Sequence, residues 1–306
     1  MIIQMKAKQH STSATSTPTI LAEMRSSVLT TTLTLAIFTS GAASLSAQTD
    51  GGTVSTVQST ARPFGLSAVA PVMQAGSDAS SANFQGNVLP SVTSLLNASL
   101  GERKAVNDSA MLLDPSKLRL NTQSDVRVYF IGEGAGYNNT LGFNTEGGGV
   151  TTGDPKLIFP NASSPVSTYD PLKTANRTTS APLLPGDFVN LGSFAGGSKL
   201  DFFLIANGAS GGQSVYSTDQ SVNRDGINHV ISFAYAMKDS PYLIIGFEDL
   251  YGGGDRDFND VLFAVDIGAR NVAALMGTPE PALILTLGGF LGVVAWLRNR
   301  RQIAMA

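Results

Sequence analysis

The stretch that decides the fold, residues 246–266, reads GFEDLYGGGDRDFNDVLFAVD. It begins in an apolar segment, PYLIIGFE at residues 241–248, and it ends in NDVLFAVDI at residues 259–267. In the second segment Val261, Phe263, Val265 and Ile267 share one face. Short apolar or alternating runs bounded by Gly, Asn, Asp and Pro predict β-strands. We therefore expect two strands joined by a long loop, residues 248–260, which we call the acidic loop.

The acidic loop is a candidate metal site. Its five carboxylates face one basic residue, Arg256, so they would repel one another if they converge. A hard cation relieves such repulsion, and Ca²⁺ accepts about six to eight oxygens from irregular loops. Three consecutive glycines would let main-chain carbonyls approach the ion. We expect Ca²⁺ to be bound by six residues of this loop: Glu248, Asp249, Asp255, Asp257, Asn259 and Asp260.

The acidic loop has two other interpretations. Residues 255–260, DRDFND, resemble the start of an EF-hand loop. However, Asp260 stands where an EF-hand needs Gly, and a strand is expected to follow instead of a helix. The loop could instead be a solvated hairpin whose carboxylates are satisfied by Arg256 and main-chain amides. The number of potential ligands favours the cation site.

Composition excludes several classes of site. The chain of 306 residues has no cysteine, which rules out disulfides, thiolate zinc sites and cysteine nucleophiles. Leaving out residues 1–47 and 282–306, with six basic residues and one acidic residue, reduces the totals of 20 and 23 to 14 basic and 22 acidic residues, a net charge of −8. Nucleic acid is not an expected partner, because phosphate binding needs a basic surface.

The remaining body of the chain also predicts strands. DVRVYFIG (125–132), KLDFFLIA (199–206) and HVISFAYA (229–236) are bounded by turn residues, with no strong amphipathic helix between them. This pattern favours a mainly β fold, an antiparallel β-sandwich or jelly-roll-like domain at residues 114–270. A Ser/Thr/Gly-rich lead-in at 48–113, weakly ordered and with a possible helix from Leu89 onward, precedes it. A linker at 271–278 follows it.

Both ends of the chain look like address segments. In residues 1–47, Arg25 precedes a modest apolar run at 28–38 and small residues up to Ala47, the layout of a secretory signal peptide. Met24 is a second candidate start, and the alternative is a buried N-terminal helix. Near the other end, residues 282–297 form an apolar segment that would be about 24 Å long as a helix. The arginines beyond it predict a cytoplasmic C-terminus and a body outside the inner membrane.

The order of features in residues 279–306 resembles the PEP-CTERM sorting signal. An apolar segment lies between a Pro-Glu-Pro motif and a basic cluster: Pro279, Glu280 and Pro281, then Arg298, Arg300 and Arg301. The resemblance implies that the tail inserts transiently into the inner membrane as a single hydrophobic helix and is processed by an exosortase. The protein would then reach the cell surface or extracellular matrix of a Gram-negative-type bacterium. An ordinary C-terminal membrane anchor is the alternative.

A second resemblance lies in the body. GFEDLYGGGDRDFNDVLF at residues 246–263 is similar to the signature of an exported bacterial domain of unknown function, family 4114. FIGEGAGYNNTLGF at 130–143 resembles the other recurrent segment of that family, so the likeness is expected to span residues 125–267. It implies a β-rich surface module without a settled activity, with calcium binding as an expectation.

An enzymatic role is not expected. GASGG at residues 208–212 matches G-x-S-x-G, with Asp219 or Asp225 and His229 following in hydrolase order, but no helix pattern follows Ser210. We expect an exported, non-enzymatic structural or adhesive protein of the cell surface, matrix or biofilm. The alternative is a calcium-dependent adhesin that binds extracellular polysaccharide, and a remote alternative is a serine hydrolase using Ser210.

Overall fold

The structure is a computed structural model that describes residues 53–100, 112–168, 170, 173–235 and 239–277. These residues all belong to one of two compact units of the chain, residues 45–306. The predicted signal peptide and sorting tail lie outside the described residues. Within the described ranges, no helix has both the length and the apolar character needed to cross a membrane.

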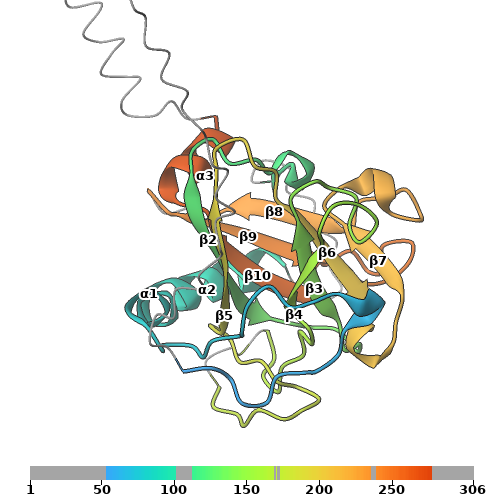
Figure 1. The fold of residues 1–306 in the computed structure, drawn as a ribbon. Coiled ribbons are helices and arrows are strands. Elements are labelled where there is room, and N and C mark those ends of the chain that lie inside the picture. Colours follow the sequence, from blue (N-terminus) through green and yellow to red (C-terminus); the bar gives the residue numbers. More distant parts are fainter. Residues whose placement is uncertain (1–52, 101–111, 169, 171–172, 236–238, 278–306) are drawn as a thin grey trace, which may run out of the picture. The chain divides into compact units, whose positions relative to one another are not determined.

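Two antiparallel sheets form the core of this unit, as the sequence predicts (Figure 1). The larger sheet has the order β1 (Leu112–Leu113), β8 (Val230–Ala234), β9 (Tyr242–Phe247), β10 (Val261–Asp266), β2 (Ser124–Gly132) and β5 (Phe188–Phe194). The smaller sheet has the order β4 (Lys156–Phe159), β3 (Thr140–Asn144), β6 (Asp201–Ala206) and β7 (Ser214–Ser217). The five strands expected from sequence are confirmed as β2, β6, β8, β9 and β10.

The main core lies between the two sheets, in a β-sandwich-like arrangement. Val126, Val128 and Phe130 of β2 share this core with the apolar face of β10, so the predicted alternation is confirmed in both strands. Phe202 of β6 meets Phe263 of β10 with ring centroids 5.3 Å apart. Two inward faces of period-two strands thus supply one shared interior.

Phe263 provides a test of this core. Its side chain is fully buried between Phe202 and Phe247. Phe263→Ala should therefore lower the free energy of unfolding by about 3–5 kcal/mol, since the lost contacts leave a cavity. Urea denaturation measures this loss. Phe64→Ala, the same substitution at a side chain that is 51% exposed, should cost less than about 1 kcal/mol. Equal losses in the two variants would contradict the assigned core.

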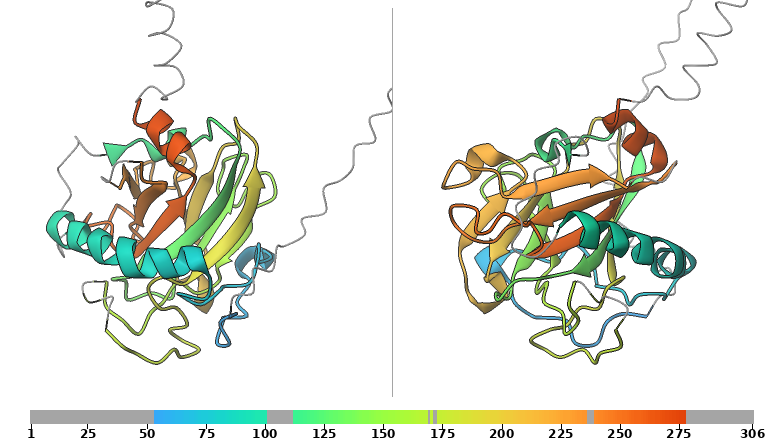
Figure 2. Two further views of the ribbon diagram at one scale, coloured as in Figure 1. Left: turned by 90° about the vertical axis from the view of Figure 1, so that its left-hand side faces the viewer. Right: turned by 180° about the vertical axis from the view of Figure 1, so that it is seen from behind.

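The outer face of the larger sheet is covered by helices (Figure 2). After α1 (Ala79–Asn83) and a π-helical turn (Phe84–Val88), α2 spans Leu89–Ser99, with Pro at its start, where a missing amide costs nothing. Apolar side chains of these helices pack against Tyr129, Ile131 and Ile244. This second core explains why both faces of β2 are buried. The possible helix expected from Leu89 is thus present as α2, and residues 101–111 lie outside the described ranges.

The lead-in differs from the weak order expected of it. Met73 forms an isolated bridge to Phe188 of β5, and Ala68 forms one to Leu157 of β4. Val72 is 2% exposed in the main core. Residues 53–78 therefore cover an edge strand of each sheet, which protects edges that would otherwise be open to pairing. Main-chain pairing holds this segment, and a Ser/Thr/Gly-rich composition gives no sign of it.

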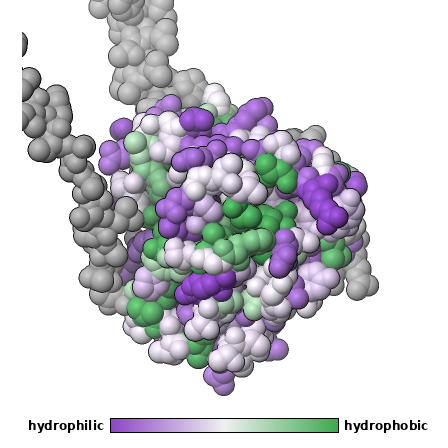
Figure 3. Space-filling view, turned by 45° about the vertical axis from the view of Figure 1, so that its right-hand side comes forward, coloured by the Kyte–Doolittle hydropathy of each residue, from purple (hydrophilic) through white to green (hydrophobic). Residues whose placement is uncertain are grey.

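A smaller apolar cluster lies on the outer face of the four-stranded sheet. Leu157, Phe203 and Ile205 are fully buried there beneath the partly buried Leu66 and Val150. The face turned forward in Figure 3 carries hydrophobic surface set among polar side chains. Loops, not a third sheet, therefore provide the cover on this side.

The last described helix, α3 (Ala269–Leu275), crosses the boundary expected between domain and linker at residues 270 and 271. Val272 packs into the main core. The side-chain oxygen Oδ1 of the buried Asn271 accepts hydrogen bonds from the main-chain amides of Asn121 and Thr122, both at 2.8 Å. The folded unit thus includes part of the segment expected to be a linker.

Candidate metal centre

The acidic loop begins and ends at neighbouring positions because β9 and β10 pair antiparallel. Phe247 is opposite Val261, and the Asp260 amide donates to the Phe247 carbonyl at 3.1 Å. On the other side of β9, the Glu248 amide donates to the carbonyl of His229 at 2.9 Å. The sheet therefore fixes both ends of the loop. Because a strand follows the loop, the exclusion of an EF-hand stands.

Three carboxylates of the acidic loop converge. Glu248, Asp255 and Asp257 each place one carboxylate oxygen within 4.8 Å of the other two. Glu248 and Asp257 are 2% and 3% exposed, whereas Asp255 is exposed. Oxygens bound to one Ca²⁺ lie about 2.4 Å from it, so two on opposite sides are about 5 Å apart. The spacing of this three-carboxylate group fits a single ion.

Glycine is required beside this group. Gly252, Gly253 and Gly254 have φ values of 83°, 84° and 46°, in the region that side chains disfavour. A Cβ atom on Gly254 would lie 2.0 Å from Oε1 of Glu248. The main chain at residue 254 can approach the Glu248 carboxylate this closely only because it carries no side chain.

The other expected ligands lie next to this group but are engaged in hydrogen bonds. Asn139 donates to Oδ2 of Asp249 at 2.7 Å, and the Asp249 amide donates to Oδ2 of Asp260 at 2.7 Å. Asn259 donates from Nδ2 to Oδ2 of Asp257, also at 2.7 Å. Of the six residues expected to bind Ca²⁺, three are therefore brought together. Asn259 contacts one of these three, Asp257, whereas Asp249 and Asp260 are hydrogen-bonded to each other.

Burial and mutual repulsion raise the pKa values of these carboxyl groups. Burial raises the pKa of Glu248 to about 7, and the nearby charges of Asp255 and Asp257 add to the effect. Burial, reinforced by the charge of Asp249, raises the pKa of Asp260 to about 8. The pKa of Asp249 is raised as well, again chiefly by burial. The charged state of the cluster is thus disfavoured as long as no cation compensates it.

The basic residue of the loop does not supply that compensation. Arg256 is exposed, has a φ of 61°, and forms no ion pair within the part of the chain that the structure describes. The solvated hairpin named both Arg256 and main-chain amides as partners of the carboxylates. The first is not seen, whereas the Phe258 amide donates to Glu248 at 3.3 Å and the Asp249 amide donates to Asp260.

Two residues outside the acidic loop, Asp225 and His229, hold its main chain, and no sequence pattern assigned them to a metal site. His229 is fully buried and stacks on Tyr216 with ring centroids 3.9 Å apart. Its Nε2 lies 2.8 Å from Oδ2 of Asp225, and its Nδ1 lies 3.1 Å from the Glu248 carbonyl oxygen. Burial alone would raise the pKa of Asp225, but hydrogen bonds from the Gly252 amide and the imidazole lower it.

Of the residues of the hydrolase alternative, Asp225 and His229 are in contact, but no hydrogen bond among the described residues joins them to Ser210. Ser210 is exposed at the end of a short 3-10 turn, Gly208–Ser210, and its hydroxyl accepts from Asn138 Nδ2 at 2.9 Å. Both ring nitrogens of His229 contact other groups. A serine nucleophile needs its base within hydrogen-bond reach, and none of the hydrogen bonds among the described residues joins Ser210 to His229.

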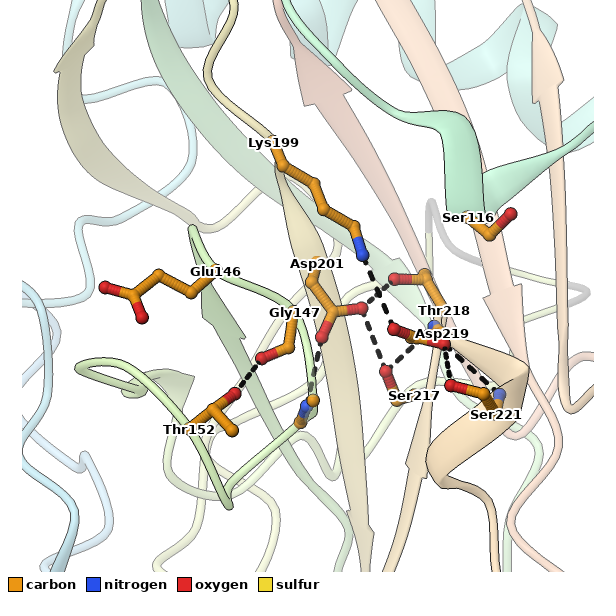
Figure 4. A network of polar contacts seen from close by, with 12 residues as sticks. Ser116, Glu146, Gly147, Thr152, Lys199, Asp201, Ser217, Thr218, Asp219 and Ser221 are labelled. Carbon is orange, nitrogen blue, oxygen red and sulfur yellow. Dashed lines mark hydrogen bonds and ion pairs between the residues drawn. The ribbon is translucent and has the colours of Figure 1, made fainter. Parts of the chain in front are cut away.

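A second buried acid, Asp201, does not suit a cation. Its carboxylate accepts from the hydroxyls of Ser217, at 2.8 Å, and Thr218, and from the amide of Gly149 at 3.1 Å. Figure 4 shows these groups around Asp201, with the neighbouring ion pair of Lys199 and Asp219. Because hydrogen-bond donors already satisfy the carboxylate, Asp201 fixes the glycine-rich β3–β4 loop to β6 and β7.

The two segments that carry the family resemblance are neighbours in space. The Gly134 amide donates to the Asn259 carbonyl at 2.9 Å, and Asn139 donates to Asp249. Glu133 joins the same acidic region, since burial, with a contribution from the charge of Asp249, raises its pKa to about 7. Residues 130–143 therefore form one wall against the acidic loop.

Together, fold and site define a class: a two-sheet antiparallel β protein with an acidic, glycine-rich loop between neighbouring strands. Residues 194–268 match the family model described as Domain of unknown function (DUF4114). The matched range contains β6 to β10 and the whole acidic loop. The resemblance, expected over residues 125–267, is thus confirmed from residue 194 onward. No curated protein and no solved structure matches the chain.

Proposed function

We propose that this protein is an exported surface or matrix protein whose β-domain is stabilised by one Ca²⁺ ion in the acidic loop. The observation that carries the proposal is the three-carboxylate group of Glu248, Asp255 and Asp257, whose oxygens converge although two of the three side chains are buried. The role is structural and not catalytic. The ion replaces repulsion between the two halves of the loop by shared coordination.

Calcium fits this group better than magnesium. Mg²⁺ requires near-ideal octahedral geometry, whereas Ca²⁺ tolerates irregular loops and mixed carboxylate, carbonyl and water ligands. The irregular main chain of the loop, with positive φ at Arg256 and Phe258 as well as at its glycines, matches that tolerance. Asp255 is exposed, so water can complete the coordination on the outer side.

Thermal unfolding with and without calcium tests the structural role. For a site filled at about ten times its dissociation constant, binding adds about 1.4 kcal/mol of stability. For a domain of this size that corresponds to a rise in Tm of about 3–6 °C. Magnesium at the same concentration should give a smaller rise. An unchanged Tm at millimolar calcium would remove the structural role.

Gly254→Ala should weaken calcium binding, since its Cβ would displace the Glu248 carboxylate. We expect the affinity for Ca²⁺ to fall at least about 10-fold. Gly197→Ala, outside the acidic loop, is the matched control: it also has a positive φ, but its Cβ would meet nothing within 4 Å. Both variants lose some stability from main-chain strain. Calcium titration should distinguish them, and equal affinities would show that Gly254 does not shape the site.

Export and processing form the second part of the proposal, and they rest on the sequence of the two ends. The N-terminal segment would direct secretion. The tail would anchor a precursor in the inner membrane until an exosortase acts at Pro279-Glu280-Pro281. Replacing these three residues by Ala should leave the precursor in the membrane fraction of an exosortase-containing host. Processing that is unchanged in this variant would point to an ordinary membrane anchor.

One observation favours the adhesin as a second candidate. Leu250 and Tyr251 are 44% and 68% exposed, so the loop that would hold the ion also presents an apolar and an aromatic side chain to solvent. An exposed tyrosine face can stack on a sugar ring while the ion binds hydroxyl groups. Glycan arrays probed with and without calcium separate the candidates. Calcium-dependent binding that Tyr251→Ala removes would support the adhesin, whereas an empty array would support a purely structural ion.

A further inference from the structure

We propose that Asp225 and His229 are positioning residues for the acidic loop, which hold Glu248 and Gly252 in place before an ion binds. The proposal deepens the calcium function and rests on it. Asp225 and His229 lie on the connection between β7 and β8, not on the loop. They therefore constrain the loop from a separate part of the chain.

His229 holds the main chain of Glu248 from two directions. Its carbonyl oxygen accepts the Glu248 amide at 2.9 Å, and its Nδ1 lies 3.1 Å from the Glu248 carbonyl oxygen. The imidazole cannot swing away, because it is fully buried and stacked on Tyr216 with an interplanar angle of 20°. One residue thus satisfies both main-chain polar groups of the first ligand in the loop.

Asp225 extends this constraint to the glycines. Its Oδ2 accepts the Gly252 amide at 2.8 Å and contacts His229 Nε2 at 2.8 Å. The loop is therefore held at Glu248 and again at Gly252, while Leu250 and Tyr251 between them are exposed. Such two-point attachment fixes the direction in which the chain leaves β9.

Two fixed points matter because the Glu248 carboxylate must be aimed before binding. A site that is ordered in advance loses less conformational entropy when its ion arrives, and it binds more tightly. Groups that orient metal ligands typically change the affinity about 10–100-fold when they are removed. The Asp225–His229 pair is placed to have this effect without offering an oxygen to the three-carboxylate group.

Hydrogen exchange of the calcium-free full chain, kept in solution with a mild detergent, tests the positioning directly. In Asp225→Ala we expect the Gly252 and Glu248 amides to exchange at least about 10-fold faster. The Gly252 amide loses its acceptor, and the Glu248 amide is bonded to His229, which loses its contact with Asp225. The Val128 amide in β2 should be unchanged. Asp154→Asn, at an exposed carboxylate paired with Lys156, is the matched control. Asp225→Asn keeps an acceptor oxygen and should restore part of the protection.

Calcium titration of the same variants gives the second measurement. We expect Asp225→Ala to bind Ca²⁺ about 10–100-fold more weakly than the wild type, with Asp225→Asn in between. Unchanged exchange at Gly252 and Glu248, or an unchanged affinity despite faster exchange, would overturn the positioning role. If Asp225→Ala does not fold, Asp225→Asn decides by the same two criteria. A wild type that binds no calcium refutes the proposed function instead, and the exchange data still show whether the pair holds the loop.

Discussion

Asp257→Asn is expected to abolish the stabilisation of the protein by calcium. Asp257 is 3% exposed and supplies one of the three converging oxygens. The substitution keeps the shape of the side chain but removes one negative charge, and calcium affinity depends strongly on the charge of the ligands. We expect the affinity to fall about 100-fold or more. Differential scanning calorimetry across a calcium series measures the effect as the loss of the rise in Tm.

Without calcium, Asp257→Asn should no longer lower the stability of the protein relative to the wild type. Removing one of three mutually repelling carboxylates relieves the calcium-free loop, so Asp257→Asn should then be at least as stable as the wild type. Asp154→Asn, far along the chain at an exposed side chain, should respond to calcium as the wild type does. If Asp257→Asn destabilises the protein equally with and without calcium, the residue serves the fold and does not bind an ion.

The stability of the calcium-free protein should fall as the pH rises from about 5 to about 8. The pKa values of Glu248 and Asp260 are raised to about 7 and about 8, far above those of an unfolded chain. Between these limits the folded state holds more protons than the unfolded state, so raising the pH favours unfolding. The stabilising contribution is complete below about pH 4 and is lost as the pH passes through the folded-state pKa values.

Calcium should oppose this trend, because Ca²⁺ competes with protons for the same oxygens and binds more tightly as the pH rises. Chemical denaturation at pH 5, 6, 7 and 8, in chelator and in excess calcium, measures both curves. They should diverge with increasing pH. A calcium-free stability that is flat or rising over this range would show that the acidic loop is not the repelling cluster inferred from the structure.

Local sequence patterns were enough to predict the two strands on either side of the site and the acidic loop between them. The alternation of residues 261–267 specified which face of β10 is buried, and the glycines and carboxylates between two strands specified where an ion could lie. These features are local, because a strand pattern repeats every two residues and a turn is set by its own residues. Strands such as β3 and β7 were missed, since TLGFN and SVYS mix small and polar residues without a clear alternation.

The sequence could not show which residues of the acidic loop converge on one point and which are bound to other parts of the chain. In the sequence, the six residues expected to bind Ca²⁺ look equally suited to do so. In the structure, Asn139 donates a hydrogen bond to one of them, Asp249, across 110 positions of the chain. His229 was notable in the sequence only as a possible catalytic base, and its contact with Glu248 spans 19 positions. Such pairings follow from the order of strands in the sheet, which no local pattern specifies.

The central claim, that the acidic loop binds calcium, is tested most directly by calorimetric titration of the full chain with Ca²⁺. We expect one saturable site per chain with a dissociation constant of about 0.1–1 mM or tighter, the range in which extracellular modules hold calcium. Binding should disappear in Asp257→Asn. The absence of any binding heat up to several millimolar calcium, together with an unchanged Tm, would contradict the claim.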